Sequence, residues 1–206
     1  MLGALLLLCG HARIPPQSLV RAPQLAPVAL KDGDLVFRRG RSFASDVVLS
    51  ADPKSMYSHV GIVVVREAVP MVVHAEPGDG RERGGVTMAD QFSTFIEPDE
   101  TSAYAVYRVR PGLEAIARRA AQRAESYERA ATPFDSAFDL STPDRLYCTE
   151  LVWRSYLDAG LNLAPAGPEE LGLPFFKKQV LLPSLISGSK DLVEVAKFRS
   201  GNGGNR

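Results

Sequence analysis

Two neighbouring runs of β-branched residues constrain the fold of this chain more than any other feature. The first covers residues 59–65 (His-Val-Gly-Ile-Val-Val-Val) and the second residues 71–75 (Met-Val-Val-His-Ala), with only residues 66–70 between them. Val and Ile favour strands, and so short a connection joins antiparallel neighbours. We therefore predict an antiparallel hairpin at the centre of the fold. Further short strands are predicted over residues 34–38, 86–88, 104–110 and 192–195.

Two other segments have helical periodicity. Apolar residues recur three or four positions apart between Leu113 and Tyr127, with charged residues on the other faces. A second run extends from about Arg145 to Ala159 and stops at Gly160, a residue that commonly ends helices. Strands in the middle of the chain with helices on either side predict an α+β fold, in which a small antiparallel sheet packs against helices. Shorter helical segments are predicted over residues 42–49 and 90–95.

The length of 206 residues suits one folded domain, which we place at residues 31–199. A Pro-rich linker is predicted over residues 13–30 and a disordered Gly/Asn-rich tail over residues 200–206. Residues 1–12 are a compact apolar run followed by small residues, which is typical of a secretory signal. We therefore expect export to the periplasm or cell envelope, with membrane attachment only if Cys9 is lipidated. The alternative is an apolar N-terminal helix packed on the domain.

Charge and cysteine content narrow the function classes. The 24 basic and 24 acidic residues cancel, and no stretch concentrates Lys or Arg, so the sequence lacks the basic surface of a nucleic-acid-binding protein. The only two cysteines, Cys9 and Cys148, could form at most one disulfide, which is too few for a disulfide-stabilised fold. Neither nucleic-acid binding nor a disulfide framework is expected.

Cys148 lies in the predicted start of the helix over residues 145–159, in the segment Leu-Tyr-Cys-Thr-Glu-Leu-Val. The positive end of a helix dipole favours thiolate over thiol, and the thiolate is the nucleophile. A lone cysteine on an apolar helix face is more often a small core residue. Two alternatives are therefore open for Cys148, a catalytic nucleophile or a packing residue.

His59 opens the first run of the hairpin, where its ring would emerge at a sheet edge near a helix N-terminus. A cysteine nucleophile needs such an imidazole as its base, although a strand-end histidine often bonds only locally. His74 on the neighbouring strand could orient the ring of His59, and Glu76, with the same strand parity, could do so instead. One Cys and two His without closely spaced ligand pairs argue against a metal site. We expect neither metal nor cofactor.

These motifs, taken in order, resemble a known family. The match extends from about Lys31 to Val195, and although each motif alone is weak, their order is fairly specific. The motifs that carry the resemblance are Gly33-Asp34-Leu35-Val36-Phe37, Ser58-His59-Val60-Gly61-Ile62-Val63, Val73-His74-Ala75, Gly85-Val86-Thr87 and Leu146-Tyr147-Cys148-Thr149-Glu150-Leu151-Val152. With these motifs the chain is similar to the YiiX/YaeF-like permuted papain-type cysteine hydrolases, relatives of the NlpC-type cell-wall peptidases and of the lecithin retinol acyltransferase group.

The resemblance implies a permuted papain-like fold in which the histidine strands precede the cysteine helix. It implies Cys148 as nucleophile, His59 as base and His74 as the ring-orienting residue, at a position where many members are expected to carry Glu. The implied activity is hydrolysis of an amide bond in a peptide, a peptidoglycan-derived peptide or an acyl-amide. Acyl transfer or lipid deacylation by the same residues is one alternative, and an inactive binding domain is another. The resemblance also implies that an aromatic and acidic loop before the cysteine lines the cleft, with Phe134, Asp135, Phe138 and Asp139.

Overall fold

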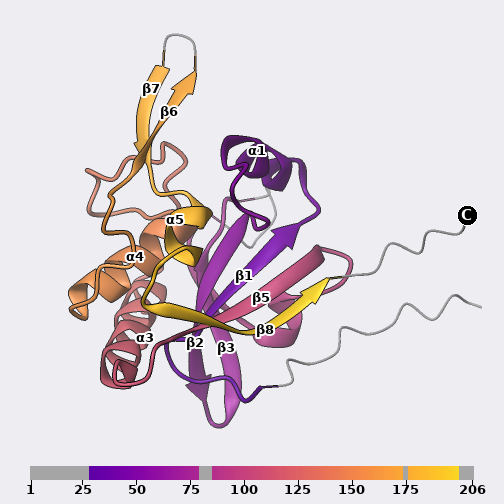
Figure 1. The fold of residues 1–206 in the computed structure, drawn as a ribbon, viewed down its shortest axis with the longest axis vertical. Coiled ribbons are helices and arrows are strands. Elements are labelled where there is room, and N and C mark those ends of the chain that lie inside the picture. The colour runs from indigo at the N-terminus through magenta and orange to yellow at the C-terminus, as the bar shows by residue number, and fades with distance from the viewer. Residues whose placement is uncertain (1–27, 79–84, 174–175, 200–206) are drawn as a thin grey trace, which may run out of the picture.

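A computed structural model describes residues 28–78, 85–173 and 176–199 (Figure 1). The predicted signal segment, most of the predicted linker and the predicted tail lie outside these residues. Six strands form one antiparallel sheet in the order β4-β3-β2-β1-β5-β8. Their bounds are β1 (Leu35–Gly40), β2 (His59–Arg66), β3 (Val69–Ala75), β4 (Thr87–Gln91), β5 (Thr101–Val109) and β8 (Leu192–Arg199).

The central hairpin is confirmed as the pair β2 and β3. Ile62 lies opposite Val73, and Arg66 lies opposite Val69 at the closed end. Glu67 and Ala68 form the two-residue connection with φ angles of 50° and 65°. Two successive residues with positive φ make the type of turn whose twist matches a tight antiparallel hairpin.

Helices cover both faces of the sheet, and strand alternation decides which side chain faces which layer (Figure 1). On β1, Leu35 and Phe37 belong to the larger core, to which the sheet-packed helices α3 (Glu114–Arg129) and α4 (Cys148–Asp158) contribute. Val36 between them belongs to a second core on the other face, which includes Phe92 and Phe95 of the short helix α2 (Phe92–Phe95). The α+β architecture predicted from the sequence is therefore confirmed.

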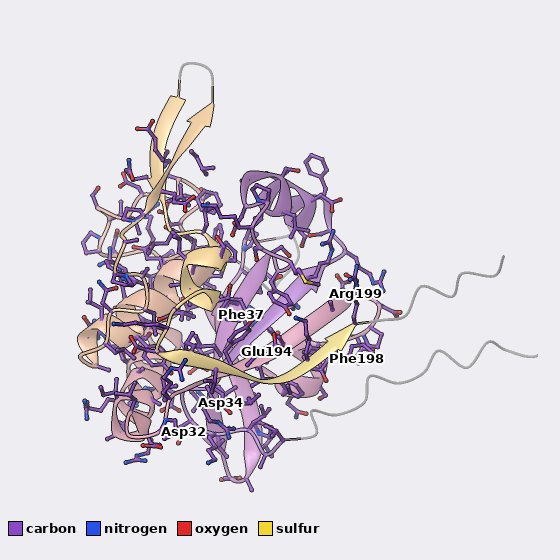
Figure 2. All side chains as sticks on the ribbon, in the orientation of Figure 1. Asp32, Asp34, Phe37, Glu194, Phe198 and Arg199 are labelled. Atoms are coloured by element: carbon purple, nitrogen blue, oxygen red, sulfur yellow. The ribbon has the colours of Figure 1, made fainter. Side chains whose placement is uncertain are left out.

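The C-terminal part completes the sheet and adds a second, small one. β8 pairs with β5, and Phe198 stacks on Tyr104 with ring centroids 5.5 Å apart. Phe198 lies near the end of β8 (Figure 2). The sequence did not predict the separate two-stranded hairpin, which projects from the body of the molecule (Figure 1). None of the helices in the described ranges is long and apolar enough to cross a bilayer. The remaining elements are α1 (Phe43–Ala51), β6 (Glu169–Leu173), β7 (Phe176–Val180) and α5 (Pro183–Ser187).

The cysteine helix begins later than the sequence predicted. α4 starts at Cys148 itself, whereas the predicted start was near Arg145. Leu146 is fully buried and bridges to Phe134, and Tyr147 is extended, with φ −102° and ψ 171°. Burial of these two side chains holds the backbone out of the helix. Cys148 is therefore the first helical residue, the position closest to the positive end of the helix dipole.

Candidate active site

Three polar side chains on consecutive strands form a hydrogen-bonded chain at one edge of the sheet. Nε2 of His59 lies 3.0 Å from Nδ1 of His74, and Nε2 of His74 lies 3.1 Å from Oδ2 of Asp90. His74 is completely buried, and His59 is only 9% exposed. We call His59, His74 and Asp90 the imidazole relay.

The hydrogen-bond network assigns a proton to each ring. A carboxylate only accepts hydrogen bonds, so Asp90 accepts from Nε2–H of His74. With the His74 proton on Nε2, its Nδ1 accepts a hydrogen bond from Nε2–H of His59. This leaves Nδ1 of His59 without a proton. The relay therefore presents one defined basic nitrogen, on the residue that the sequence predicted as the base.

Burial keeps that base in its neutral form. The pKa of His59 is lowered well below the usual 6.5, mainly because the ring is removed from water and also because Arg38 and His74 lie near it. The ring also stacks on Phe95, with centroids 5.6 Å apart. A neutral imidazole at pH 7 can accept a proton from a thiol.

Glu76 lies beside the relay but is held by another partner. Its Oε1 accepts a 2.7 Å hydrogen bond from Arg38, whose guanidinium lies 4.6 Å above the ring of Phe95. Its Oε2 lies 3.9 Å from Nδ1 of His74. Of the two side chains that the sequence offered for orienting His59, it is the ring of His74 that lies within hydrogen-bond distance.

Cys148 lies against the strand that carries His59. α4 packs on β2, and the backbone N–H of Val60 interacts with the Cys148 sulfur. The pairing of β2 with β3 ends at Ile62 and Val73. Alternate residues of a strand direct their N–H groups to the same side, so Val60 turns its N–H toward the side where β3 no longer pairs. The Cys148 sulfur therefore lies beside Val60, the residue that follows His59 on β2, at the end of the hairpin where β3 no longer pairs.

Two opposing effects act on the Cys148 thiol. Burial raises its pKa to about 11, while the backbone N–H groups of Val60, Thr149 and Cys148 itself act in the opposite direction. The negative charge of Glu76 adds to the rise. The stabilisation expected from the helix start is present, but desolvation outweighs it. The resting pair is therefore a neutral thiol and a neutral imidazole rather than an ion pair.

The loop before α4 is fastened to that helix. Asp135 is fully buried and accepts a 2.9 Å hydrogen bond from the N–H of Ala137 and another from that of Asp139. Arg154 of α4 donates to the carbonyl of Leu140. Phe138 is 36% exposed and contacts Tyr147, the residue before the cysteine, with ring centroids 5.2 Å apart. The loop thus presents an accessible aromatic ring beside the start of α4.

Two polar residues of this region were missed in the sequence. Asp90 lies on β4 two positions beyond Met88, the residue opposite His74, so it is a diagonal neighbour within reach of the His74 ring. Arg38 lies directly opposite His59 on β1. Both could have been found only from the strand register, because neither belongs to a recognisable local motif.

Comparison with known proteins defines the class. The model of the family described as permuted papain-like amidase enzyme, YaeF/YiiX, C92 family, matches residues 29–167. This range includes the relay, Cys148 and the whole segment between them. The chain belongs to this family of permuted papain-like amidases.

Two relatives agree with this assignment. The chain is 33% identical over 128 residues to the uncharacterized protein YiiX of Escherichia coli strain K12, across 62% of this chain and 57% of the relative. It therefore spans less than two thirds of that relative's length. It also resembles the crystal structure of metalloprotein yiiX from Escherichia coli O157:H7. The TM-score is 0.67 and the identity 26%, over 84% of this chain and 99% of that one.

Proposed function

We propose that this protein hydrolyses amide bonds with Cys148 as the nucleophile and His59 as the base. The relay is the observation that supports the proposal most directly. It leaves Nδ1 of His59 without a proton, on the strand whose Val60 N–H interacts with the Cys148 sulfur. The family match adds that related chains are described as amidases.

The protonation states favour transfer of the thiol proton during attack, not before it. As the sulfur of Cys148 bonds to the carbonyl carbon, its proton passes to Nδ1 of His59. The imidazolium then protonates the leaving amine as the C–N bond breaks, which leaves a thioester. Water, deprotonated by the same nitrogen, hydrolyses the thioester and restores the thiol. The negative charge of Asp90, acting through His74, stabilises the transient imidazolium.

The start of α4 supplies hydrogen-bond donors for the developing oxyanion. Cys148 is the first residue of the helix, where backbone N–H groups have no partner within the helix. We propose that its own N–H binds the oxyanion, as donors aimed at that charge lower the barrier of acyl transfer. The exposed ring of Phe138 would pack against an apolar part of the substrate.

The proposed substrates are peptides, including cell-wall peptides, and acyl-amides, in an exported protein of the periplasm or cell envelope. The same residues could transfer the acyl group to an acceptor other than water, or deacylate a lipid. Transfer and hydrolysis share the thioester, so the second nucleophile decides between them. The product formed with and without added amine or alcohol acceptors distinguishes these reactions.

The name metalloprotein given to the solved relative raises the question whether this chain can hold a metal ion. Nitrogen atoms of His59 and His74 and a carboxylate oxygen of Glu76 all lie within 4.8 Å of one another. Imidazole and carboxylate suit a divalent ion such as Zn²⁺, so the residues fit. A bound ion would supply Lewis-acid chemistry. In the reaction proposed above, the thiol, the relay and the helix start carry every step.

Replacing Cys148 tests the proposal. Cys148→Ala should abolish release of amine from a panel of peptide and acyl-amide substrates, while Cys9→Ala, the matched replacement of the other cysteine, should retain it. Mass spectrometry should detect the substrate acyl group on Cys148 of the unmodified protein. Unchanged activity of Cys148→Ala on every amide and ester tested would refute the proposal.

A further inference from the structure

The atoms that form the relay also form a compact set of metal-ligand atoms. Nδ1 of His74 lies 3.0 Å from Nε2 of His59 and 3.9 Å from Oε2 of Glu76. Bonds of about 2.0–2.1 Å in a tetrahedral site place neighbouring ligand atoms roughly 3.3 Å apart. The two separations lie on either side of that value, and all three ligand atoms lie within 4.8 Å of one another. Small side-chain movements would therefore bring all three atoms to one ion.

The surroundings of these three ligands also suit a bound ion. Asp90 accepts a hydrogen bond from Nε2 of His74, and this backing by a carboxylate is typical of metal-bound histidines. Arg38 holds Oε1 of Glu76 and leaves Oε2 on the side of His74. Both histidines are buried, while the Glu76 side chain is 38% exposed. The ion could therefore enter from the side of Glu76.

We propose that a divalent ion such as Zn²⁺ binds His59, His74 and Glu76, and that this bound form is catalytically silent. The second part rests on the proposed function. Metal binding requires the lone pair of Nε2 of His59, which carries the relay proton in the metal-free protein. When the ion binds Nε2, the neutral ring holds its proton on Nδ1. Nδ1 then cannot accept the thiol proton, so the ion and the thiol chemistry exclude each other.

Calorimetric titration with ZnCl₂ tests the site. The untagged full chain would carry Cys9→Ala and His11→Ala, which remove the cysteine and the histidine that lie outside the described residues. Added Glu76→Gln should weaken binding at least 10-fold, because Gln supplies a neutral ligand. Glu100→Gln, a matched change of an exposed residue, should alter it less than about 2-fold. Equal affinity of these two variants would overturn the proposed site.

Two further measurements test the ligand set and the silent state. Added Cys148→Ala should leave the affinity for Zn²⁺ within about 3-fold, because the sulfur is not one of the three ligands. Loss of binding in this variant would overturn the assignment. Saturating Zn²⁺ should slow release of amine from a substrate of the metal-free protein at least 10-fold in the chain that retains Cys148, since His59 can no longer accept the thiol proton. An unchanged rate with Zn²⁺ would show that metal binding and the thiol chemistry do not exclude each other, which would overturn that part of the proposal. If the Cys148→Ala variant retained amide-hydrolysing activity, the proposed function would be refuted. The metal site would still stand or fall by the calorimetry, which does not depend on activity.

Discussion

The two ends of strand β2 carry polar groups in opposite surroundings. At its start, His59 is buried and bonds to one side chain of the relay. At its end, Arg66 is 36% exposed and forms ion pairs of 3.1 Å and 2.8 Å with Glu125 and Glu128 of α3. The Arg66 end uses full charges that water partly reaches, whereas the buried end uses two hydrogen-bonded rings with the Asp90 carboxylate at their far side.

This difference shows how burial changes the cost of removing one partner from a polar interaction. Exposed ion pairs gain little because water already stabilises both charges, and they can be removed with small effect. A buried polar group without its partner loses its hydration and gains nothing in return. The start of β2 should therefore be sensitive to single substitutions, and its other end should not.

The largest contrast is expected from truncating the two ends in parallel. His59→Ala removes the base and should lower the rate of amide hydrolysis about 1,000-fold. Arg66→Ala should change it less than about 2-fold, because its ion pairs with Glu125 and Glu128 lie at the end of β2 opposite to His59. Steady-state kinetics of both variants make the comparison. Similar losses in the two would show that activity depends on the strand as a whole.

Removing the far member of the relay should have the next largest effect. Asp90→Ala leaves the tautomer of His74 undefined, so we expect kcat to fall about 10- to 100-fold with little change in KM. Asp99→Ala, an exposed change of the same type, should leave kcat unaltered. A loss in KM instead of kcat would mean that Asp90 acts on substrate binding and not on the base.

The state of the resting thiol can be read from its alkylation. Because the pKa of Cys148 is raised to about 11, its reaction with iodoacetamide should keep accelerating above pH 9. At pH 7 it should be at least 10-fold slower than that of an unfolded thiol, whose pKa is about 8.5. A plateau below pH 7 would contradict this and indicate a thiolate and imidazolium pair in the free protein.

Glu150 allows the same reasoning about burial to be tested through stability. It is fully buried on α4, and burial raises its pKa to about 7, while Arg154 acts in the opposite direction. Since the folded-state pKa exceeds the unfolded value, its contribution to stability is present at pH 4.5 and below and is lost as the pH rises through 7. Glu150→Gln keeps an acceptor for Arg154 and removes this loss. The difference in the free energy of unfolding between Glu150→Gln and the unmodified protein should therefore increase in favour of Glu150→Gln from pH 5 to pH 8, by on the order of 1 kcal/mol. Denaturant unfolding at both pH values measures it, and an unchanged difference would refute the ionisation assigned to Glu150.

The smallest effect is expected for the stability contribution of the exposed end. Arg66→Ala should lower the free energy of unfolding by less than about 1 kcal/mol, and 0.5 M NaCl should shrink the difference further. Denaturant unfolding with and without salt measures it. A loss above about 2 kcal/mol would show that these pairs are not screened as exposed charges are.

The sequence predicted the parts of the fold that local patterns encode. The β-branched runs located β2 and β3, and the apolar spacing located α3. It placed the start of α4 three residues too early, because the extended form of Leu146 and Tyr147 comes from burial against the rest of the molecule. The hairpin of β6 and β7 was not predicted, since neither strand shows a clear alternation of apolar and polar residues.

The candidate site was predictable in its residues but not in its connections. Cys148, His59 and His74 were selected from their positions in helix and strands. Asp90 required the register between β3 and β4, which no local pattern fixes. The proposed metal-ligand set could not be read from the sequence for a related reason. Ligand spacing along the chain is a guide for compact motifs, whereas here two strands bring His59 beside His74 and Glu76.

The relay lies wholly on three consecutive strands, β2, β3 and β4, and the proposed nucleophile Cys148 follows much later in the chain. During synthesis the ribosome therefore releases the proton acceptor and its supports before it releases the sulfur. A partly made chain that ends before α4 therefore contains His59 and its supports but lacks the Cys148 thiol. In a cell that makes this protein, the proposed cleavage can begin only after the ribosome has released α4 and the helix has docked on the strands that precede it.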